Sequence, residues 1–274
     1  MHDDALREFF EREDAAVDAD PTWPDAHAAL LDALEAGRVR AAERDPDGAW
    51  RPVAWVKRAI LTGFRRSATV PMEAASATPF FDRAAFPARA FAAGDGVRLV
   101  PGGTAVRRGA RVAPGVVVMP PAYVNVGAWV GAGTMVDSHA LVGSCAQVGE
   151  RVHLSAGAQL GGVLEPVHAS PVVVEDDAFV GALVGVFEGV VVRERAVLAA
   201  GVVLTAATVI HDLVEERELR GEVPAGAVVV PGTRPLRGRY AEERGLSAAA
   251  PMIVKYRDGR TDAATALESA LRGG

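Results

Sequence analysis

The sequence predicts a mainly β protein: a parallel β-helix of hexapeptide repeats, preceded by a mostly helical N-terminal domain and followed by a small C-terminal extension. Three observations support this fold class. An aliphatic residue recurs every six positions through the middle of the chain, a small residue follows most of them four positions later, and both patterns stop near the ends. A period of six fits neither an α-helix nor a simple strand, and it is typical of repeats that wind three to a triangular coil. We therefore expect three parts, at residues 1–96, 97–234 and 235–274.

The aliphatic repeat defines the expected core. Its first run consists of Val100, Val106, Val112, Val118, Val124, Val130, Val136, Val142, Val148, Leu154 and Leu160. It resumes with Val174, Val180, Val186, Val192, Leu198, Leu204 and Ile210, and then with Val223 and Val229. We expect these side chains to point into the coil and to stack on their equivalents one coil away. Because one coil cannot bury its own core, the repeats gain stability only as a stack.

Small residues are expected at the corners of each coil. The residue four positions after each aliphatic is expected to be small because it lies near a tight corner. Glycine adopts positive φ at little cost, so it suits corners that need this conformation. Candidates for such corners are Gly127, Gly131, Gly143, Gly149 and Gly181.

The repeat is interrupted twice before it ends. Residues 164–171 and 212–222 are expected to be loops that leave the prism and return in register. Loops that project from a rigid framework often carry binding groups. Beyond the repeat, residues 251–256 are expected to form one edge strand and residues 262–271 a terminal helix.

The N-terminal part has a different periodicity. Apolar residues recur at helical spacing over residues 6–10 and 28–34, and Gly37 is expected to end the second of these helices. Asp47-Gly48 lies between two extended runs and predicts a hairpin. Helical spacing returns over residues 55–64.

Composition excludes several classes of function. The 274 residues carry a formal net charge of −6, so we expect no basic surface for nucleic acid. One cysteine excludes a disulfide framework and a multi-cysteine metal cluster. The N-terminus is acidic and no apolar run of about 18 residues occurs, so we expect neither a secretory signal nor a membrane span. The expected protein is cytoplasmic, without a metal and without a membrane partner.

Several phrases in the repeat region resemble one known family. They are MPPAYVNVGAWVGAGTMVDSHALVGSCAQVGERVHLSAG from Met119, GGVLEP from Gly161, FEGVVV from Phe187 and GEVPAGAVVVPG from Gly221. Together they resemble the 2,3,4,5-tetrahydropyridine-2,6-dicarboxylate (tetrahydrodipicolinate) N-succinyltransferases, which are hexapeptide-repeat acyltransferases. The likeness extends upstream to WVKRAILTGFR and FFDRA.

The resemblance implies a left-handed parallel β-helix and a homotrimer with its active sites between neighbouring prisms. It implies transfer of a succinyl group from succinyl-CoA to the amine of ring-opened tetrahydrodipicolinate, L-2-amino-6-oxopimelate, in diaminopimelate and lysine biosynthesis. Succinyl-CoA, or another acyl-CoA, would act as co-substrate. We expect no permanently bound cofactor and no covalent enzyme intermediate.

Three residues match functional positions of the family, and two arginines lie where relatives place part of CoA. Asp137 matches the aspartate that contacts the acceptor amine, and we expect it to orient or deprotonate that amine. Arg98 matches a substrate-binding arginine, whose planar fork suits carboxylates. Gly201 matches a glycine beside the pantetheine arm of CoA, and Arg234 and Arg237 follow the last repeat, where relatives place the nucleotide end. The alternatives are a turn-capping role for Asp137 and solvated charges for the arginines.

The sequence departs from the family in one stretch. Leu183, Val184 and Gly185 stand where the family commonly has Arg, Ser and Glu, and that Glu is a proposed catalytic group in relatives. Glu188 is retained, and we take it as a second candidate catalytic residue. An apolar wall in place of charge suggests an acceptor that lacks one carboxylate, or a different acyl chain.

Other interpretations remain open. One is a paralogous CoA-dependent N-acyltransferase that acts on a less charged cyclic imino acid or amino acid in specialised metabolism. Another is an inactive trimeric scaffold. Cys145 is a weaker candidate for an acyl-carrying nucleophile, because small buried cysteines usually only pack. A base or a metal site could also be built from His139, His153, His168 and His211, although no motif supports one.

Overall fold

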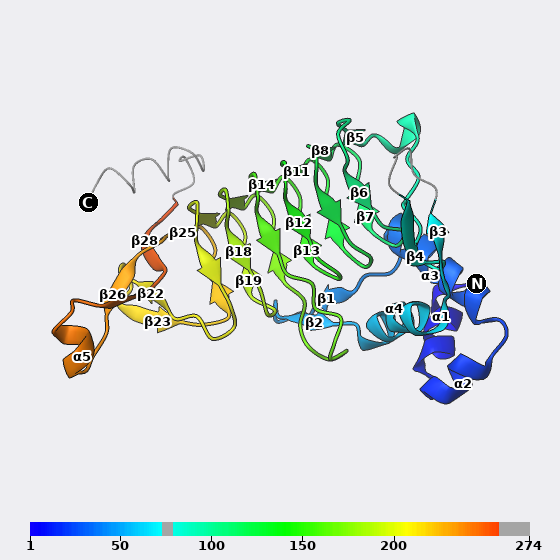
Figure 1. Cartoon of the computed structure of the whole chain (residues 1–274), viewed down its shortest axis with the longest axis horizontal. Coiled ribbons are helices and arrows are strands. Elements are labelled where there is room, and N and C mark those ends of the chain that lie inside the picture. The colour runs from blue at the N-terminus through cyan, green and yellow to red at the C-terminus, as the bar shows by residue number, and fades with distance from the viewer. Residues whose placement is uncertain (73–78, 258–274) are drawn as a thin grey trace.

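A triangular prism of stacked coils forms the centre of the molecule (Figure 1). The structure is a computed structural model and describes residues 1–72 and 79–257. Each coil contributes one two-residue strand to each of three parallel sheets, which we call the first, second and third faces in chain order. The parallel β-helix predicted from the six-residue period is therefore present.

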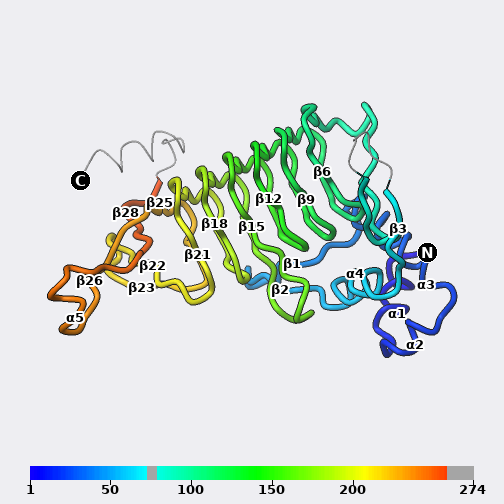
Figure 2. Tube along the Cα trace, in the orientation of Figure 1, coloured from blue at the N-terminus to red at the C-terminus, as the bar shows by residue number. Residues whose placement is uncertain are grey.

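The strands of each face lie side by side along the prism. The first face contains β5 (Arg98–Leu99), β8 (Val117–Val118), β11 (Met135–Val136), β14 (His153–Leu154), β17 (Phe179–Val180), β20 (Val197–Leu198) and β25 (Ala227–Val230). The second face, whose strands follow one another in Figure 2, contains β6 (Ala105–Val106), β9 (Tyr123–Val124), β12 (Leu141–Val142), β15 (Gln159–Leu160), β18 (Gly185–Val186) and β21 (Val203–Leu204). The third face contains β7 (Arg111–Val112), β10 (Trp129–Val130), β13 (Gln147–Val148), β16 (Val173–Val174), β19 (Val191–Val192) and β24 (Glu222–Val223).

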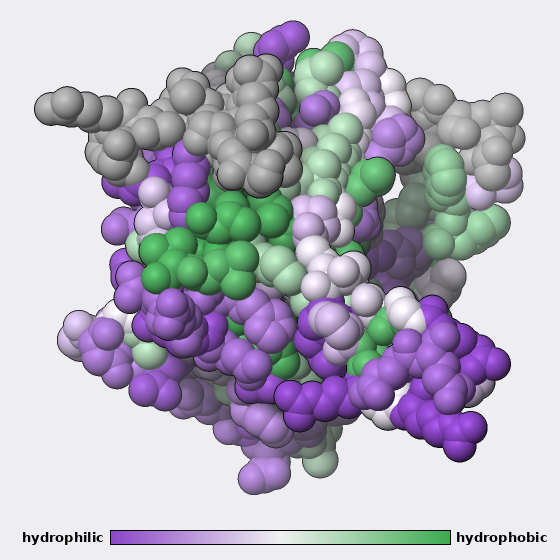
Figure 3. Space-filling model, turned by 90° about the vertical axis from the view of Figure 1, so that its left-hand side faces the viewer, coloured by the Kyte–Doolittle hydropathy of each residue, from purple (hydrophilic) through white to green (hydrophobic). Residues whose placement is uncertain are grey.

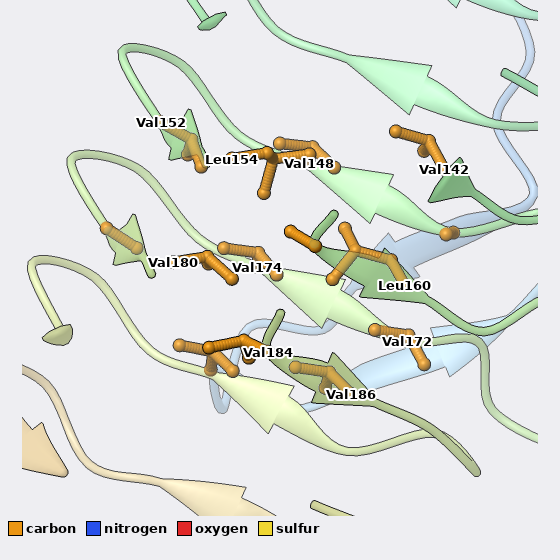
Figure 4. Packing of buried hydrophobic residues seen from close by; sticks show 14 of the residues in the cluster. Val142, Val148, Val152, Leu154, Leu160, Val172, Val174, Val180, Val184 and Val186 are labelled. Atoms are coloured by element: carbon orange, nitrogen blue, oxygen red, sulfur yellow. The ribbon is translucent and has the colours of Figure 1, made fainter. Parts of the chain in front are cut away.

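In each two-residue strand of the prism the first residue faces outward and the second faces the core. Val136, for example, is fully buried and pairs in register with Val118 on one side and Leu154 on the other. Figure 4 shows how these aliphatic side chains meet inside the prism. The residues four positions later, such as Ala128 and Ala146, are also buried in this core. They are small because they point inward between larger side chains, and this corrects the expectation that a tight corner alone keeps them small.

The coil turns at three edges. The first edge follows the first-face strands and includes residues 137–139, 155–157, 181–183 and 199–201. The second edge follows the second-face strands and includes residues 125–127, 143–145 and 187–189. The third edge follows the third-face strands and includes residues 131–133, 149–151, 175–177 and 193–195.

The edges correct the expectation about most of the corner glycines. Gly127 has positive φ, at 74°. Gly131, Gly143, Gly149 and Gly181 do not; they lie where the next coil approaches. A Cβ on Gly131 would lie 2.4 Å from the carbonyl oxygen of Gly149, and the other three would meet neighbouring atoms at 2.2 to 2.7 Å. Close stacking of coils therefore requires glycine at these four positions.

The N-terminal region packs beside the first coils. It contains α1 (Asp3–Glu11), α2 (Asp14–Ala19), α3 (Trp23–Ala36), β1 (Ala42–Arg44), β2 (Trp50–Pro52) and α4 (Ala54–Arg66). Gly37 ends α3 with φ at 76°, and β1 and β2 form the hairpin predicted around Asp47-Gly48. A second hairpin was not predicted; it consists of β3 (Thr69–Met72) and β4 (Phe80–Arg83). The short helix η1 (Ala93–Asp95) precedes the prism.

The β1–β2 hairpin lies against the third face. The guanidinium of Arg40, just before β1, lies over the rings of Trp50 and Trp129, at 4.9 and 4.2 Å from their centroids. Its Nε donates a hydrogen bond of 2.5 Å to the buried amide oxygen of Gln147. Burial lowers the pKa of Arg40 to about 10. These contacts join the N-terminal region to the prism.

The two interruptions of the repeat differ in structure. Residues 164–171 contain no strand and form a loop, as expected. The expected loop at 212–222 is wrong in part, because β22 (Ile210–Asp212) and β23 (Arg217–Leu219) pair as a hairpin there. This hairpin continues the first face through β28 (Met252–Tyr256). The buried Asp212 holds it, since its Oδ2 accepts a 2.6 Å hydrogen bond from the Tyr256 hydroxyl.

The C-terminal extension returns to the last coil. It contains β26 (Thr233–Pro235), α5 (Arg239–Glu242), β27 (Ser247–Ala249) and β28. β28 confirms the strand expected at 251–256, but the expected edge position is wrong, because β28 pairs with β22 on one side and with β25 on the other. Figure 3 looks onto this end, where an apolar surface lies among hydrophilic side chains. The helix expected over residues 262–271 lies outside the described residues. The boundaries of the three domains stay a prediction. Within the described part of the chain, no helix is long and apolar enough to cross a membrane.

Candidate active site

Asp137 lies on the first edge, directly after β11. Its backbone N–H donates to the carbonyl oxygen of Leu154 at 2.9 Å, and its Oδ1 accepts the N–H of Ser138 at 2.7 Å. The side chain is half-buried. The carboxylate is therefore oriented by its own turn, which is suitable for a group that must meet a ligand at a fixed place.

The first edge also carries Leu183 and Gly201. The edge is continuous, because Gly157, Leu183 and Gly201 each donate a backbone N–H to the preceding coil at 2.8 to 3.0 Å. Leu183 has φ at 58° and is 73% exposed. A Cβ on Gly201 would meet none of the described atoms within 4 Å. Asp137 and Gly201 therefore lie on the same edge, and open space lies outside Gly201.

Glu188 lies on the second edge, away from Asp137. Its Oε2 accepts the N–H of Ala206 at 3.2 Å. It lines a cavity of about 620 Å³ beneath the inserted loop, together with Val163, Glu165, Ser170, Phe187 and Thr205. The second face separates this edge from the first edge. The two candidate catalytic carboxylates are therefore not brought together within one chain.

The candidate arginines lie toward opposite ends of the prism. Arg98 is exposed on β5, in the first coil, and β8 separates it from β11. Adjacent strands lie about 4.8 Å apart, so Arg98 and Asp137 are separated by roughly 10 Å along the prism axis. Arg234 in β26 and Arg237 after it are exposed beyond the last coil. The order along the prism is Arg98, Asp137, Gly201 and then the two arginines, which is compatible with an extended ligand.

Two family models and the sequence relatives point to one family. A model described as "Tetrahydrodipicolinate N-succinyltransferase N-terminal" matches residues 3–65, and one described as "Hexapeptide repeat of succinyl-transferase" matches residues 171–206. A 2,3,4,5-tetrahydropyridine-2,6-dicarboxylate N-succinyltransferase of Polynucleobacter asymbioticus is 47% identical, over 89% of this chain and 88% of the relative. The relative of the same name from Ralstonia nicotianae is 46% identical, over 90% of this chain and 89% of the relative. The chain belongs to the tetrahydrodipicolinate N-succinyltransferase family.

A solved structure supports the fold. It comes from Campylobacter jejuni and is described as a 2,3,4,5-tetrahydropyridine-2-carboxylate N-succinyltransferase. The TM-score is 0.58 at 19% identity, and the match covers 84% of this chain and 62% of that chain. With the hexapeptide-repeat match, this likeness confirms the predicted fold class, a left-handed parallel β-helix with helical N-terminal and small C-terminal parts.

The three residues that depart from the family pattern face different directions. Leu183 points outward on the first edge, whereas Val184 is fully buried in the core, as Figure 4 shows. Val184 therefore forms no part of the apolar wall that the sequence suggested. Gly185 has the outward position of β18, but it is buried under the ring of Phe187.

Two residues were missed by sequence analysis, one that lines the cavity and one that contacts the inserted loop beside it. Phe187 is one, and Lys57 on α4 is the other. The Lys57 side chain is fully buried, and its Nζ donates a 2.6 Å hydrogen bond to the carbonyl oxygen of Ala169 in the inserted loop. Burial lowers the pKa of this ammonium. The available signal was a lysine at helical spacing from the apolar Ile60, but its partner lies 112 residues away.

Cys145 and His153 have structural explanations. Burial raises the pKa of the Cys145 thiol to about 12, which disfavours the thiolate that a nucleophile requires. His153 faces outward on the first face and stacks on Phe179, with ring centroids 5.1 Å apart. His139 lies on the first edge and His211 on β22. Among the described residues, no group of three or more His, Cys, Asp or Glu is placed to hold a metal ion.

Proposed function

We propose that this protein transfers the succinyl group of succinyl-CoA to the amine of ring-opened tetrahydrodipicolinate, in diaminopimelate and lysine biosynthesis. The observation that carries the proposal is the 47% identity to a relative of that name across 88% of its length. Asp137 at a fixed position on the bare first edge supports it. We place the reaction in the cytoplasm.

The chemistry is a direct acyl transfer. The acceptor nitrogen attacks the thioester carbon, a C–N bond forms, the C–S bond breaks, and CoA leaves as the thiol with a proton lost from the nitrogen. Asp137 orients the amine and accepts that proton, a role for which general-base catalysis contributes about 10²-fold or more. Arg98 binds an acceptor carboxylate. Gly201 leaves room for the pantetheine arm, and Arg234 and Arg237 meet the phosphates of CoA.

A homotrimer completes the site in this proposal. In a cyclic trimer each interface joins two different surfaces, so the first edge of one protomer can face the second edge of its neighbour. This arrangement would place Asp137 and Glu188 in one cleft, which a single chain does not achieve. Outward apolar side chains on the second face, such as Leu141 and the half-exposed Val203, support its burial between protomers. Light scattering on the purified protein should give the mass of three chains.

The test of the activity follows CoA release. Purified protein is mixed with succinyl-CoA and tetrahydrodipicolinate, and free thiol is measured over time. We expect turnover, and a loss of about a hundredfold in kcat in Asp137→Asn. Asp176→Asn is the matched control, because Asp176 on the third edge also accepts a backbone N–H, that of Glu150, at 2.8 Å. Absence of thiol release, together with absence of CoA binding, would favour the inactive scaffold instead.

A further inference from the structure

Phe187 covers the outward position of β18. A Cβ built on Gly185 would lie 2.5 Å from Cε2 and 3.0 Å from Cζ of this ring. A Cβ on Gly161, in the neighbouring coil, would lie 2.8 Å from its Cδ1. The ring therefore lies over two glycines of adjacent coils and fills the volume in which a side chain at position 185 would stand.

The same ring forms a wall of the 620 Å³ cavity that contains Glu188. Among the described residues that line this cavity, the titratable side chains are both carboxylates, Glu165 and Glu188. The nearby cation, Lys57, is engaged behind the inserted loop with the carbonyl oxygen of Ala169. An acceptor at this wall therefore meets an aromatic face and negative charge.

We propose that Phe187 determines acceptor specificity by favouring amines whose portion at this wall is uncharged over amines that carry a second carboxylate there. The inference rests on the proposed acyl transfer. A carboxylate pressed on the ring would lose water on that side, and the ring offers it no hydrogen-bond donor because its face is electronegative. Glu188 beside the ring adds repulsion between like charges. An apolar or methylene surface packs on the ring without these costs.

Of the three residues that depart from the family pattern, Leu183 and Val184 do not explain this specificity. Val184 points into the core, and Leu183 lies on the first edge and forms no part of the wall that the Phe187 ring makes. Gly185 affects specificity indirectly. Because it has no side chain, the Phe187 ring can lie flat over it. Phe187 and Gly185 thus form one unit, and changing the ring alone should change selectivity.

The experiment compares two acceptors with succinyl-CoA as the donor. One is tetrahydrodipicolinate, and the other is the cyclic imine of the same ring size that carries a single carboxylate. The quantity measured is the ratio of kcat/KM for the single-carboxylate acceptor to that for the dicarboxylate. Because both values come from one preparation, the ratio does not depend on the fraction of folded protein.

We expect Phe187→Val to lower this ratio about tenfold, the size of effect that one pocket contact supports. Phe187→Val combined with Gly185→Glu should lower it further, since the glutamate then has space and the apolar wall is gone. Phe179→Val is the matched control, because Phe179 is a half-buried outward aromatic on the first face. It should leave the ratio unchanged.

Two results would overturn the inference, and they are distinguishable. Continued transfer with the same ratio in wild type, Phe187→Val and the double variant would exclude Phe187 as the specificity residue and leave the proposed function intact. Absence of thiol release by the wild type with both acceptors would reject the proposed function, and this inference with it.

Discussion

Two edges of the prism have the same backbone and different uses. On the third edge, Arg151 pairs with Asp177 through hydrogen bonds of 2.8 and 3.0 Å, and Arg193 pairs with Glu175 at 3.0 Å. On the first edge, the turn after β11 carries Asp137 and His139, and the later turns carry Gly157, Leu183 and other small or apolar residues. The repeat fixes the path of the chain, so each edge is free to carry either stabilising pairs or a surface for a ligand.

Both edges contain residues other than glycine with positive φ. Arg151, Asp177 and Arg195 on the third edge have φ between 53° and 59°, and Leu183 on the first edge has 58°. A residue other than glycine with positive φ is often a sign of a functional site. Here the angle recurs at each edge with the period of the coil, so the fold imposes it. Position on the edge, and not strain, distinguishes the candidate active site.

The largest expected effect is on the third edge. Glu175 is 7% exposed and accepts hydrogen bonds from Trp50 in the N-terminal hairpin, from Arg193 and from the N–H of Glu194. Glu175→Ala would remove the acceptor of the Trp50 indole N–H and of the Glu194 N–H, and it would break a buried ion pair of Arg193, which keeps Glu222 and the Gly48 carbonyl oxygen as partners. We therefore expect the free energy of unfolding to fall by about 3 kcal/mol. Urea unfolding measures this change.

The matched control is Glu150→Ala on the same edge. Glu150 is 53% exposed and pairs with Arg151, and exposed pairs contribute about 0.2–1 kcal/mol. Equal losses in both variants would show that burial of the third edge by the hairpin adds no stability.

The N-terminal region that covers the third face is expected to respond to acid. His27 is buried in α3, and desolvation, with a smaller effect of Arg108, lowers its pKa to about 4 from 6.5. The unfolded chain therefore binds a proton at a higher pH than the folded one. The stability from neutral His27 is complete above about pH 6.5 and is lost as the pH falls toward 4, about 3 kcal/mol in all. Unfolding followed by Trp23 fluorescence, whose ring centroid is 6.2 Å from that of His27, measures this loss.

His27→Phe provides the control for this pH dependence. The variant keeps an aromatic ring beside Phe86 but cannot be protonated. Its stability should change less between pH 6.5 and 4 than that of the wild type. The same slope in both proteins would assign the acid sensitivity to carboxylates such as those of the third edge.

The features that could be predicted from the sequence are those that depend on local periodicity. Val136 and its equivalents give the core, because an inward residue every six positions is visible in the chain itself. Contacts between distant segments were not predictable in this way. The glycine at 131 is required by the backbone of the next coil, and β22 pairs with β28 across some forty residues. The packing of Phe187 over Gly185 could not be predicted either, because it depends on the orientation of the Phe187 side chain. Asp137 was identified by its family motif, whereas Lys57 could be assigned a role only after its partner at Ala169 was located.

The smallest expected effect compares the two edges directly. Leu183 on the first edge and Asp177 on the third have the same φ of 58°. Glycine at either site relieves a strained conformation, worth about 1 kcal/mol. Leu183→Gly should gain this stability, because the exposed leucine makes few contacts to lose. Asp177→Gly should gain less, because it also loses the hydrogen bonds from Arg151.

Urea unfolding at low and high salt separates the two contributions. Added salt screens the exposed Arg151–Asp177 pair, so the difference between the variants should shrink while the gain of Leu183→Gly persists. Equal gains at low salt would mean that the Arg151–Asp177 pair adds nothing to stability. A loss in Leu183→Gly would instead show that Leu183 packs against another protomer, which would make the first edge an interface as well as a surface for ligand.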